Sequence, residues 1–166
     1  MSFQNQGRGG GYGGPRGGSG PSRQDAKDEI KAALQSPHRV QYRGSDGKLR
    51  GDLLDKEAQA AAIALENIST TQLRRFFEQV GAIKRRIEVD PDGVGDSEVL
   101  AQVAFLKASA AYAAARSKDN ENKPVLEFVV KHANSIRTRP DFLDFHRHFE
   151  TVIAFHKVYG KDKKEN

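Results

Sequence analysis

Apolar side chains recur every three to four residues through most of this chain, which is the period of an amphipathic α-helix. Residues 70–87 show the period most clearly. Their apolar side chains form one stripe: Leu73, Phe76, Phe77, Val80, Ile83 and Ile87. Ser69 precedes the stripe and Gln72 follows three residues later, which is the spacing of a capping box. The pattern therefore predicts a helix over residues 70–87 with Ser69 as its N-cap.

Five further segments have the same period and predict helices over residues 24–35, 52–66, 97–117, 123–137 and 140–159. Pro124 and Pro140 fit first helical turns, and Gly160 fits a helix C-terminus. The helix over 97–117 is apolar around most of its circumference, so we expect it to be buried on several sides at the centre of a bundle. No alternating run is long enough to require a sheet. The predicted fold class is all-α, a single compact bundle of five to six helices.

Two segments between these helices differ in charge. Residues 36–51 are basic, and residues 45–47 (Ser-Asp-Gly) would turn a small hairpin within them. Residues 88–98 are acidic and resemble a calcium loop at first sight. Aligned from Asp90, however, the last ligand position is Ala101, so the bidentate acid of an EF-hand is missing. We expect a solvated inter-helix loop there.

The first 24 residues have a composition unlike the rest of the chain. They are rich in glycine and hold Arg8, Arg16 and Arg23 with no acidic residue. Such a segment cannot bury enough apolar surface to offset its chain entropy, so we predict a disordered RGG-like tail. Its arginines and Tyr12 would suit sequence-independent RNA contacts, or the tail would be a flexible, solubilising extension.

Charge and cysteine usage narrow the function classes. The net charge is +5, and the three arginines of the tail supply much of it. The predicted helical domain over 25–160 is nearly balanced and is followed by a charged end over 161–166, so a nucleic-acid role needs clustered basic side chains. The absence of cysteine excludes disulfides and cysteine nucleophiles and fits a reducing, cytoplasmic compartment. No apolar run approaches the ~18 residues of a membrane span.

The first helix described above offers such a cluster. At ~100° per residue, Arg74 and Arg85 line one flank of its apolar stripe, and Arg75 and Arg86 line the other. Lys84 lies at the apolar edge, where its stem can pack while its ammonium reaches solvent. Guanidinium groups suit phosphate because their planar fork donates two parallel hydrogen bonds. The alternative is a solvated charged surface without a ligand.

The sequence gives less support to a catalytic or metal-dependent function. His146 and Glu150 are four residues apart and could share a ligand face of a metal site. The His146-x-His148 spacing, however, points two rings in different directions, and His156 falls on an apolar stripe, where we expect a hydrogen-bonded packing histidine. No Gly-rich phosphate loop or recognisable nucleophile motif is present. We therefore predict no metal site, no cofactor and no catalytic residues.

Four motifs follow one another in a recognisable order. They are KLRGDLL (Lys48–Leu54), ISTTQLRRFFEQV (Ile68–Val80), LKASAAYAAAR (Leu106–Arg116) and FETVIAFHKVYG (Phe149–Gly160). This order resembles the small subunit of the type III-A CRISPR effector, the Csm complex, over about residues 40–160. The most specific stretch is Thr70–Phe77, and the Gly-rich tail lies outside the resemblance.

The resemblance implies a non-catalytic, all-helical subunit. Such subunits stack in several copies as an inner filament and face a backbone filament that holds the guide RNA. They contact the guide–target duplex mainly through phosphates, whereas target cleavage belongs to the backbone subunit and nucleotide cyclisation to the large subunit. The expected partners are guide RNA, target RNA, the backbone and large Csm subunits and further copies of this chain, with no membrane.

With this resemblance, basic side chains become candidate RNA contacts. The leading candidates are Arg74, Arg75 and Arg85. Arg116 joins them because it shares a narrow polar stripe with Gln102 and Ser109, although a buried salt bridge is its alternative role. The second-rank candidates are Lys48, Arg50, Lys84, Arg137, Arg139, Arg147 and Lys157.

Two other hypotheses compete with this interpretation. A free-standing RNA chaperone or single-strand binder would rely on the RGG-like arm and would lose most of its affinity without residues 1–24. A small metal-dependent enzyme would use His146, Glu150 and His156 and would carry bound metal when purified.

Overall fold

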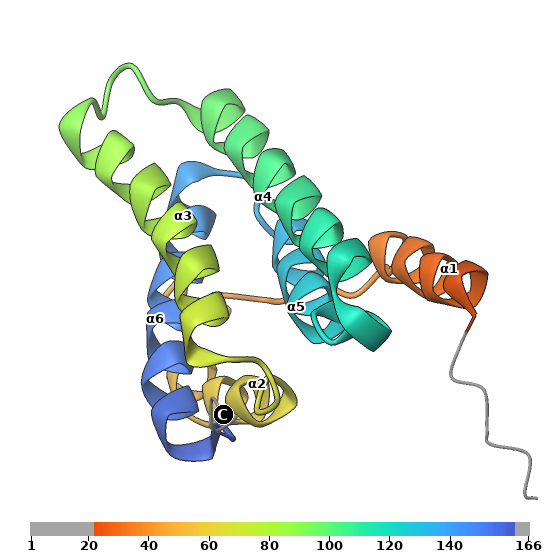
Figure 1. Cartoon of the computed structure of the whole chain (residues 1–166). Coiled ribbons are helices and arrows are strands. Elements are labelled where there is room, and N and C mark those ends of the chain that lie inside the picture. The colour runs from red at the N-terminus through yellow and green to blue at the C-terminus, as the bar shows by residue number, and fades with distance from the viewer. Residues whose placement is uncertain (1–21, 162–166) are drawn as a thin grey trace, which may run out of the picture.

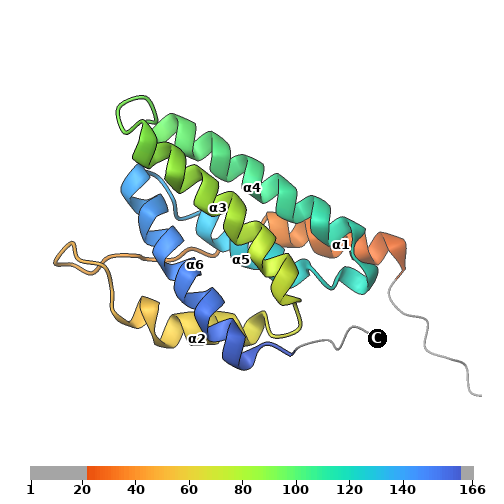
Figure 2. The same cartoon turned by 60° about the vertical axis from the view of Figure 1, so that its left-hand side comes forward.

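The computed structural model describes residues 22–161, and this part of the chain is a helical bundle (Figures 1 and 2). Its helices are α1 (Arg23–Leu34), α2 (Lys56–Ala64), α3 (Thr70–Val89), α4 (Asp96–Arg116), α5 (Lys123–Ala133) and α6 (Arg139–Tyr159). Two single 3₁₀ turns, η1 (Asp52–Leu54) and η2 (Lys118–Asn120), precede α2 and α5. The all-α prediction is confirmed. The predicted tail lies outside the described residues except for residues 22–24, and so does most of the predicted charged end.

Helix α6 lies at the centre of the bundle. It packs against α2, η1, α3 and α4, and the ring of its Phe149 lies 5.0 Å from that of Phe128 in α5. Phe142, Phe145 and Phe149 are among the largest fully buried side chains of the described residues. Thr138 caps the start of α6 with Asp141 in a reciprocal capping box, and Pro140 occupies the first turn as predicted. Buried aromatic area on this one helix organises the core.

Helix α4 is not the central helix, so that prediction was wrong. One stripe of α4 is buried: Val99, Val103, Leu106, Ala110 and Ala114. The opposite side faces solvent, where Phe105 is 69% exposed and Tyr112 is 63% exposed. The sequence of α4 is apolar on nearly all sides because it contains many alanines. Since alanine is small and fits either a buried or an exposed side, it does not indicate which side packs. Figure 1 shows α4 running along the outside of the bundle, joined to α3 by the loop at the top.

Two helices are shorter than predicted. The segment predicted as one helix over 52–66 is divided at Asp55, where φ −120° and ψ −91° are not helical, and only η1 and α2 remain. Leu53 in η1 is fully buried, so its packing takes precedence over helix continuity. Helix α5 ends at Ala133, and the side-chain amide of the following residue, Asn134, donates to the carbonyl of Ser36, 2.7 Å away.

The basic segment between α1 and η1 contains the small hairpin that the sequence favoured. The Gly44 N–H donates to the Lys48 carbonyl at 2.9 Å, and Arg43 and Leu49 form an isolated antiparallel bridge. Gly47 adopts φ 75°, a left-handed conformation that glycine tolerates without strain. The Arg43 guanidinium donates to Asp144 at 2.7 Å, which fixes the hairpin to α6. This contact raises the pKa of Arg43.

Buried imidazoles tie distant elements together. His148 Nδ1 lies 2.7 Å from the carbonyl oxygen of Leu53, and His156 Nε2 lies 3.1 Å from that of Leu65. Both contacts join α6 to the two ends of the η1–α2 segment. The prediction that His156 is a hydrogen-bonded packing histidine is therefore confirmed.

Helix α1 is held on the outside of the bundle by α4 and α5. Ser22 and Asp25 form a capping box, so the helix begins at Arg23, one residue before the predicted start. Its buried residues are Ile30 and Ala33. The side chain of Asn120, in the turn after α4, donates to the Ala26 carbonyl at 3.2 Å.

None of the described helices is long and apolar enough to cross a membrane.

Candidate RNA interface

Helix α3 presents the leading candidate residues to solvent. Ser69 Oγ accepts a hydrogen bond from the Gln72 N–H at 3.2 Å, which confirms the predicted N-cap. The apolar stripe then faces the core, and Arg74, Arg75 and Arg85 are all exposed. Among residues 22–161, none of these three arginines has a carboxylate partner. Their charges are therefore available to a ligand.

The two flanks of α3 adjoin different helices. Arg86 pairs with Glu98 of α4 at 3.0 Å, so the flank that Arg75 and Arg86 share faces α4. Phe77 packs against His146 of α6 with ring centroids 5.3 Å apart, so the flank with Arg74 and Arg85 lies on the α6 side. The predicted division of the arginines between two flanks agrees with this packing.

The α6 side of α3 carries mixed charge. Lys84 pairs with Glu88 one turn later at 2.5 Å, so part of its charge is neutralised. His146 lies in the field of Lys84, Glu88 and Glu150, but burial is the largest influence and lowers its pKa. Packing and a neutral ring therefore account for His146, which contacts Phe77 and not a ligand cluster.

Two second-rank candidates lie on the exposed surface of α6. Arg147 and Lys157 are both solvent-exposed, and neither has a carboxylate partner among the described residues. At ~100° per residue, Lys157 shares the side of α6 that carries His146 and Glu150, whereas Arg147 points away from the core. Lys157 is thus on the same side of the molecule as Arg74.

Arg116 ends α4 on the surface. Its guanidinium lies 5.4 Å from the centroid of the Tyr112 ring, and its Nη1 donates to the Tyr112 hydroxyl at 2.9 Å. Both side chains are exposed. The alternative of a buried salt bridge is therefore wrong. Cation–π contact holds the pair in one arrangement at the surface.

Two of the candidate arginines already bind carboxylates or carbonyls of the protein itself. Arg50 binds Asp52 at 2.6 Å and also binds Glu57, and these hydrogen bonds raise its pKa. Arg139 donates its N–H to Asp96 at 2.6 Å, and its guanidinium binds the carbonyls of Pro91 and Val94. Arg139 thereby fixes the acidic inter-helix loop to the start of α6.

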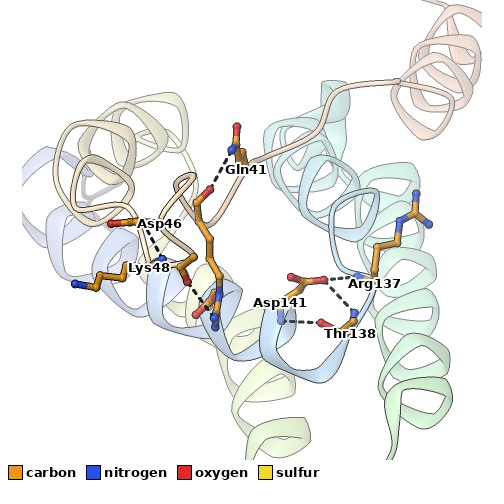
Figure 3. Close-up of polar contacts among 9 residues, drawn as sticks. Gln41, Asp46, Lys48, Arg137, Thr138 and Asp141 are labelled. Atoms are coloured by element: carbon orange, nitrogen blue, oxygen red, sulfur yellow. Dashed lines mark hydrogen bonds and ion pairs between the residues drawn. The ribbon is translucent and has the colours of Figure 1, made fainter.

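Lys48 lies in the hairpin, whereas Arg137 lies apart from it, just before the start of α6 (Figure 3). The Lys48 N–H binds Asp46 Oδ1 at 3.0 Å, and its ammonium points outwards from the hairpin. The Arg137 N–H binds Asp141 at 2.9 Å as α6 begins, and its guanidinium points away from Lys48. These two backbone contacts set the hairpin turn and the helix start but leave both basic heads exposed. They do not converge on one site.

No metal site forms in the part of the chain that the structure describes, because no three His, Cys, Asp or Glu side chains come close enough to share an ion. The proposed ligand His156 instead faces the Leu65 carbonyl. His132 was not predicted to have a structural role, yet it is buried against Tyr42 with Nδ1 2.8 Å from the phenol oxygen. Its position in the apolar run of α5 was the available signal.

Comparisons with known proteins give one family. No curated protein and no solved structure matches the chain. The family described as Csm2 Type III-A matches residues 48–162, which includes α2 to α6 and leaves out α1. The match also contains the segment 70–77, the most specific stretch of the resemblance. The chain therefore belongs to the Csm2 Type III-A family, the structural small subunits of the type III-A CRISPR Csm complex.

Proposed function

We propose that this small subunit is non-catalytic and binds the guide–target RNA duplex through phosphates. The observation that carries the proposal is the set of three exposed arginines on α3, Arg74, Arg75 and Arg85, without carboxylate partners in the described structure. Phosphate contacts position an RNA without reading its sequence. Guide–target pairing would then supply specificity, as in other RNA-guided systems.

The intramolecular contacts of the remaining basic residues indicate how available each one is to RNA. Arg50 and Arg139 already bind carboxylates or carbonyls, so we expect their substitution to affect stability more than RNA affinity. Exposed Lys157 would extend the α3 surface along α6, and Arg147 would add a positive charge on the outer side of that helix. Lys48, Arg137 and Arg116 lie at other points of the surface and would meet the RNA at its edges or contact a neighbouring subunit.

The proposal includes assembly. The family places this chain among the other subunits of a Csm complex. We propose that its partners there are further copies of itself in a short filament, the backbone and large subunits, guide RNA and target RNA, in the cytoplasm. A subunit of this kind needs no cofactor, since its role is to hold a duplex in place.

The test removes two charges from one flank of α3. Arg74→Ala combined with Arg85→Ala should weaken duplex RNA binding equally for unrelated sequences. It should also flatten the plot of log affinity against log salt by up to ~2 units, because each lost phosphate contact releases about one counterion fewer. Fluorescence anisotropy of the full-length chain over a salt series measures both quantities.

The matched control removes two exposed charges elsewhere. Arg39 and Lys131 are exposed and have no carboxylate partner within residues 22–161. Replacing both with alanine changes the net charge equally and should leave most of the affinity intact. Equal losses in the two double variants would show that bulk charge, and not the surface of α3, attracts RNA, and an unchanged salt slope in the α3 variant would overturn the proposal.

A further inference from the structure

A groove of ≈ 330 Å³ lies between α3 and α4, the two helices joined by the loop at the top of Figure 1. Ile83 and Leu106, both buried, form its apolar floor. Gln79, Gln102 and Ser109 line its sides with amide and hydroxyl groups. We call this feature the α3–α4 groove. Its volume reaches the lower end of small-molecule sites, about 300–1,000 Å³.

One exposed aromatic ring lines the α4 side of the groove, and a second is exposed further along α4. Phe105 lines the groove and is 69% exposed, although a phenyl ring has no polar atom to solvate. Tyr112 follows seven residues later on the same side of α4, about 10.5 Å along the helix axis. The Arg116 guanidinium covers part of Tyr112 and keeps that ring in place. Exposed rings at fixed positions are the usual platforms on which unpaired bases stack.

The charges around the groove favour a base inside it and a phosphate beside it. Glu98 accepts hydrogen bonds from Gln102 at 3.1 Å and pairs with Arg86 at 3.0 Å. The Arg86 charge is thus compensated, and the groove end near it is close to neutral. Arg75 shares this flank of α3 and has no carboxylate partner in the described part of the chain, so a phosphate has a cation beside the groove.

The lining chemistry also favours a nucleobase over an apolar protein side chain. A glutamine amide can donate and accept hydrogen bonds, and a serine hydroxyl can do the same. Gln102 uses its amide nitrogen on Glu98, which leaves its carbonyl oxygen as an acceptor. An apolar partner would desolvate these groups without replacing their hydrogen bonds, which costs free energy.

We propose that the α3–α4 groove holds an unpaired RNA base stacked on Phe105, with Gln79, Gln102 and Ser109 at the edge of the base. The proposal rests on the RNA-binding function proposed above, but it concerns a different flank of α3 and a different part of the RNA. Arg74 and Arg85 hold paired RNA by its phosphates, whereas the groove takes a nucleotide that has no pairing partner.

The test compares single-stranded and duplex RNA binding in full-length variants. Phe105→Leu removes the ring but keeps an apolar side chain, and Phe105→Tyr keeps the ring. We expect Phe105→Leu to weaken binding of an unstructured single strand by about five- to twentyfold, since stacking on one aromatic ring contributes this order of affinity. Duplex affinity should change less than about twofold in both variants, and Phe105→Tyr should bind like the unaltered chain.

A fluorescent base reports stacking directly. A single strand that contains 2-aminopurine should be quenched by the unaltered chain and by Phe105→Tyr but not by Phe105→Leu. Val158→Ala is the control for loss of an exposed apolar side chain, since Val158 lies on α6 and is 76% exposed. Circular dichroism melting checks that the variants fold, which we expect because Phe105 contributes little to the core.

The outcomes separate the two proposals. Equal single-strand binding by all variants, or a parallel loss of single-strand and duplex binding, overturns the groove as a base site. Normal RNA binding by Phe105→Leu with weaker self-association or weaker incorporation into the complex would make Phe105 a protein contact. Failure of the Arg74/Arg85 test with a positive Phe105 result would overturn the duplex proposal alone, and absence of RNA binding by the unaltered chain would overturn both.

Discussion

His132 illustrates how much a single side chain depends on its surroundings in this protein. Its ring lies 4.5 Å from that of Phe128 and 4.8 Å from that of Phe145, and Tyr42 supplies its hydrogen bond. Burial lowers the pKa of His132 well below the ordinary value of 6.5, and His148 and Lys131 lower it further. Protonation in the core would place an unpaired charge among aromatic rings.

Acid should therefore destabilise the fold in a defined pH range. The unfolded chain binds a proton at His132 below pH 6.5, whereas the folded chain does not until its lower pKa is reached. The free energy of unfolding should fall as the pH drops from 6.5, by up to about 1.4 kcal/mol per pH unit for His132 alone. Urea unfolding at a series of pH values measures this slope.

His148 and His146 act in the same direction, since burial also lowers their pKa values. Nuclear magnetic resonance titration of the imidazole protons assigns the slope to individual rings. A free energy of unfolding that stays constant from pH 7.5 to below 6 would contradict the buried, neutral state of these histidines.

Residue roles that depend on local sequence could be predicted, and those that depend on tertiary partners could not. Ser69 was predicted as an N-cap from three neighbouring residues, and His156 was placed on an apolar stripe by its period. Arg50 and Arg139 looked like the other basic residues. The partners of Arg139, the carbonyls of the α3–α4 loop, meet it only when the helices pack, whereas Arg50 binds acidic residues two and seven positions away.

At the scale of elements, the start of α6 offers a clear measurement. Thr138 Oγ1 accepts from the Asp141 N–H, and Asp141 accepts from the Thr138 N–H at 3.0 Å. Thr138→Ala should lower the free energy of unfolding by about 1 kcal/mol, because one end of the central helix loses a partner for its free N–H.

Thr151→Ala provides the matched control on the same helix. Thr151 lies in the interior of α6 and donates to the Arg147 carbonyl, which already accepts within the helix, so its loss should change the free energy by less than about 0.5 kcal/mol. Urea midpoints of both variants give the comparison. Equal effects would mean that the capping box contributes nothing beyond a generic threonine contact.

The presence of the helices could be predicted from the sequence. Which side of a helix is exposed, and where a helix is interrupted, could not. Most helix boundaries fall within two residues of prediction, because caps and prolines act locally. The outer position of α4 was missed since its alanines fit either a buried or an exposed side. The interruption at Asp55 was missed because the burial of Leu53 depends on α6, far along the chain.

At the scale of the whole molecule, the tail and the helical bundle can be tested separately. Removing residues 1–21 leaves Ser22 to cap α1, so the bundle should keep its stability. Duplex RNA affinity should fall by less than about fivefold if the bundle carries the main phosphate contacts. Anisotropy with the truncated chain measures this, and a loss of most affinity would instead support the RGG-arm hypothesis.

The family match covers only part of the described fold. Residues 48–162 contain the helices that pack around α6, whereas α1 and much of the hairpin precede the match. Sequence motifs identified the family because they are local strings of residues. The α3–α4 groove could not be recognised in the same way, since its two sides are 23 residues apart along the chain and meet through packing.

The histidine contacts that fasten α6 to the η1–α2 segment have a consequence for synthesis of the chain. They join residues 95 and 91 positions apart, so the segment acquires these partners only after α6 has been translated. At about 5–20 residues per second, the ribosome needs roughly 5 to 20 s to cover that distance. During that interval Leu53 and the alanines of α2 lack the helix that buries them, whereas α4 can already pack against α1, α3 and α5, so the η1–α2 segment is covered only when the last helix emerges.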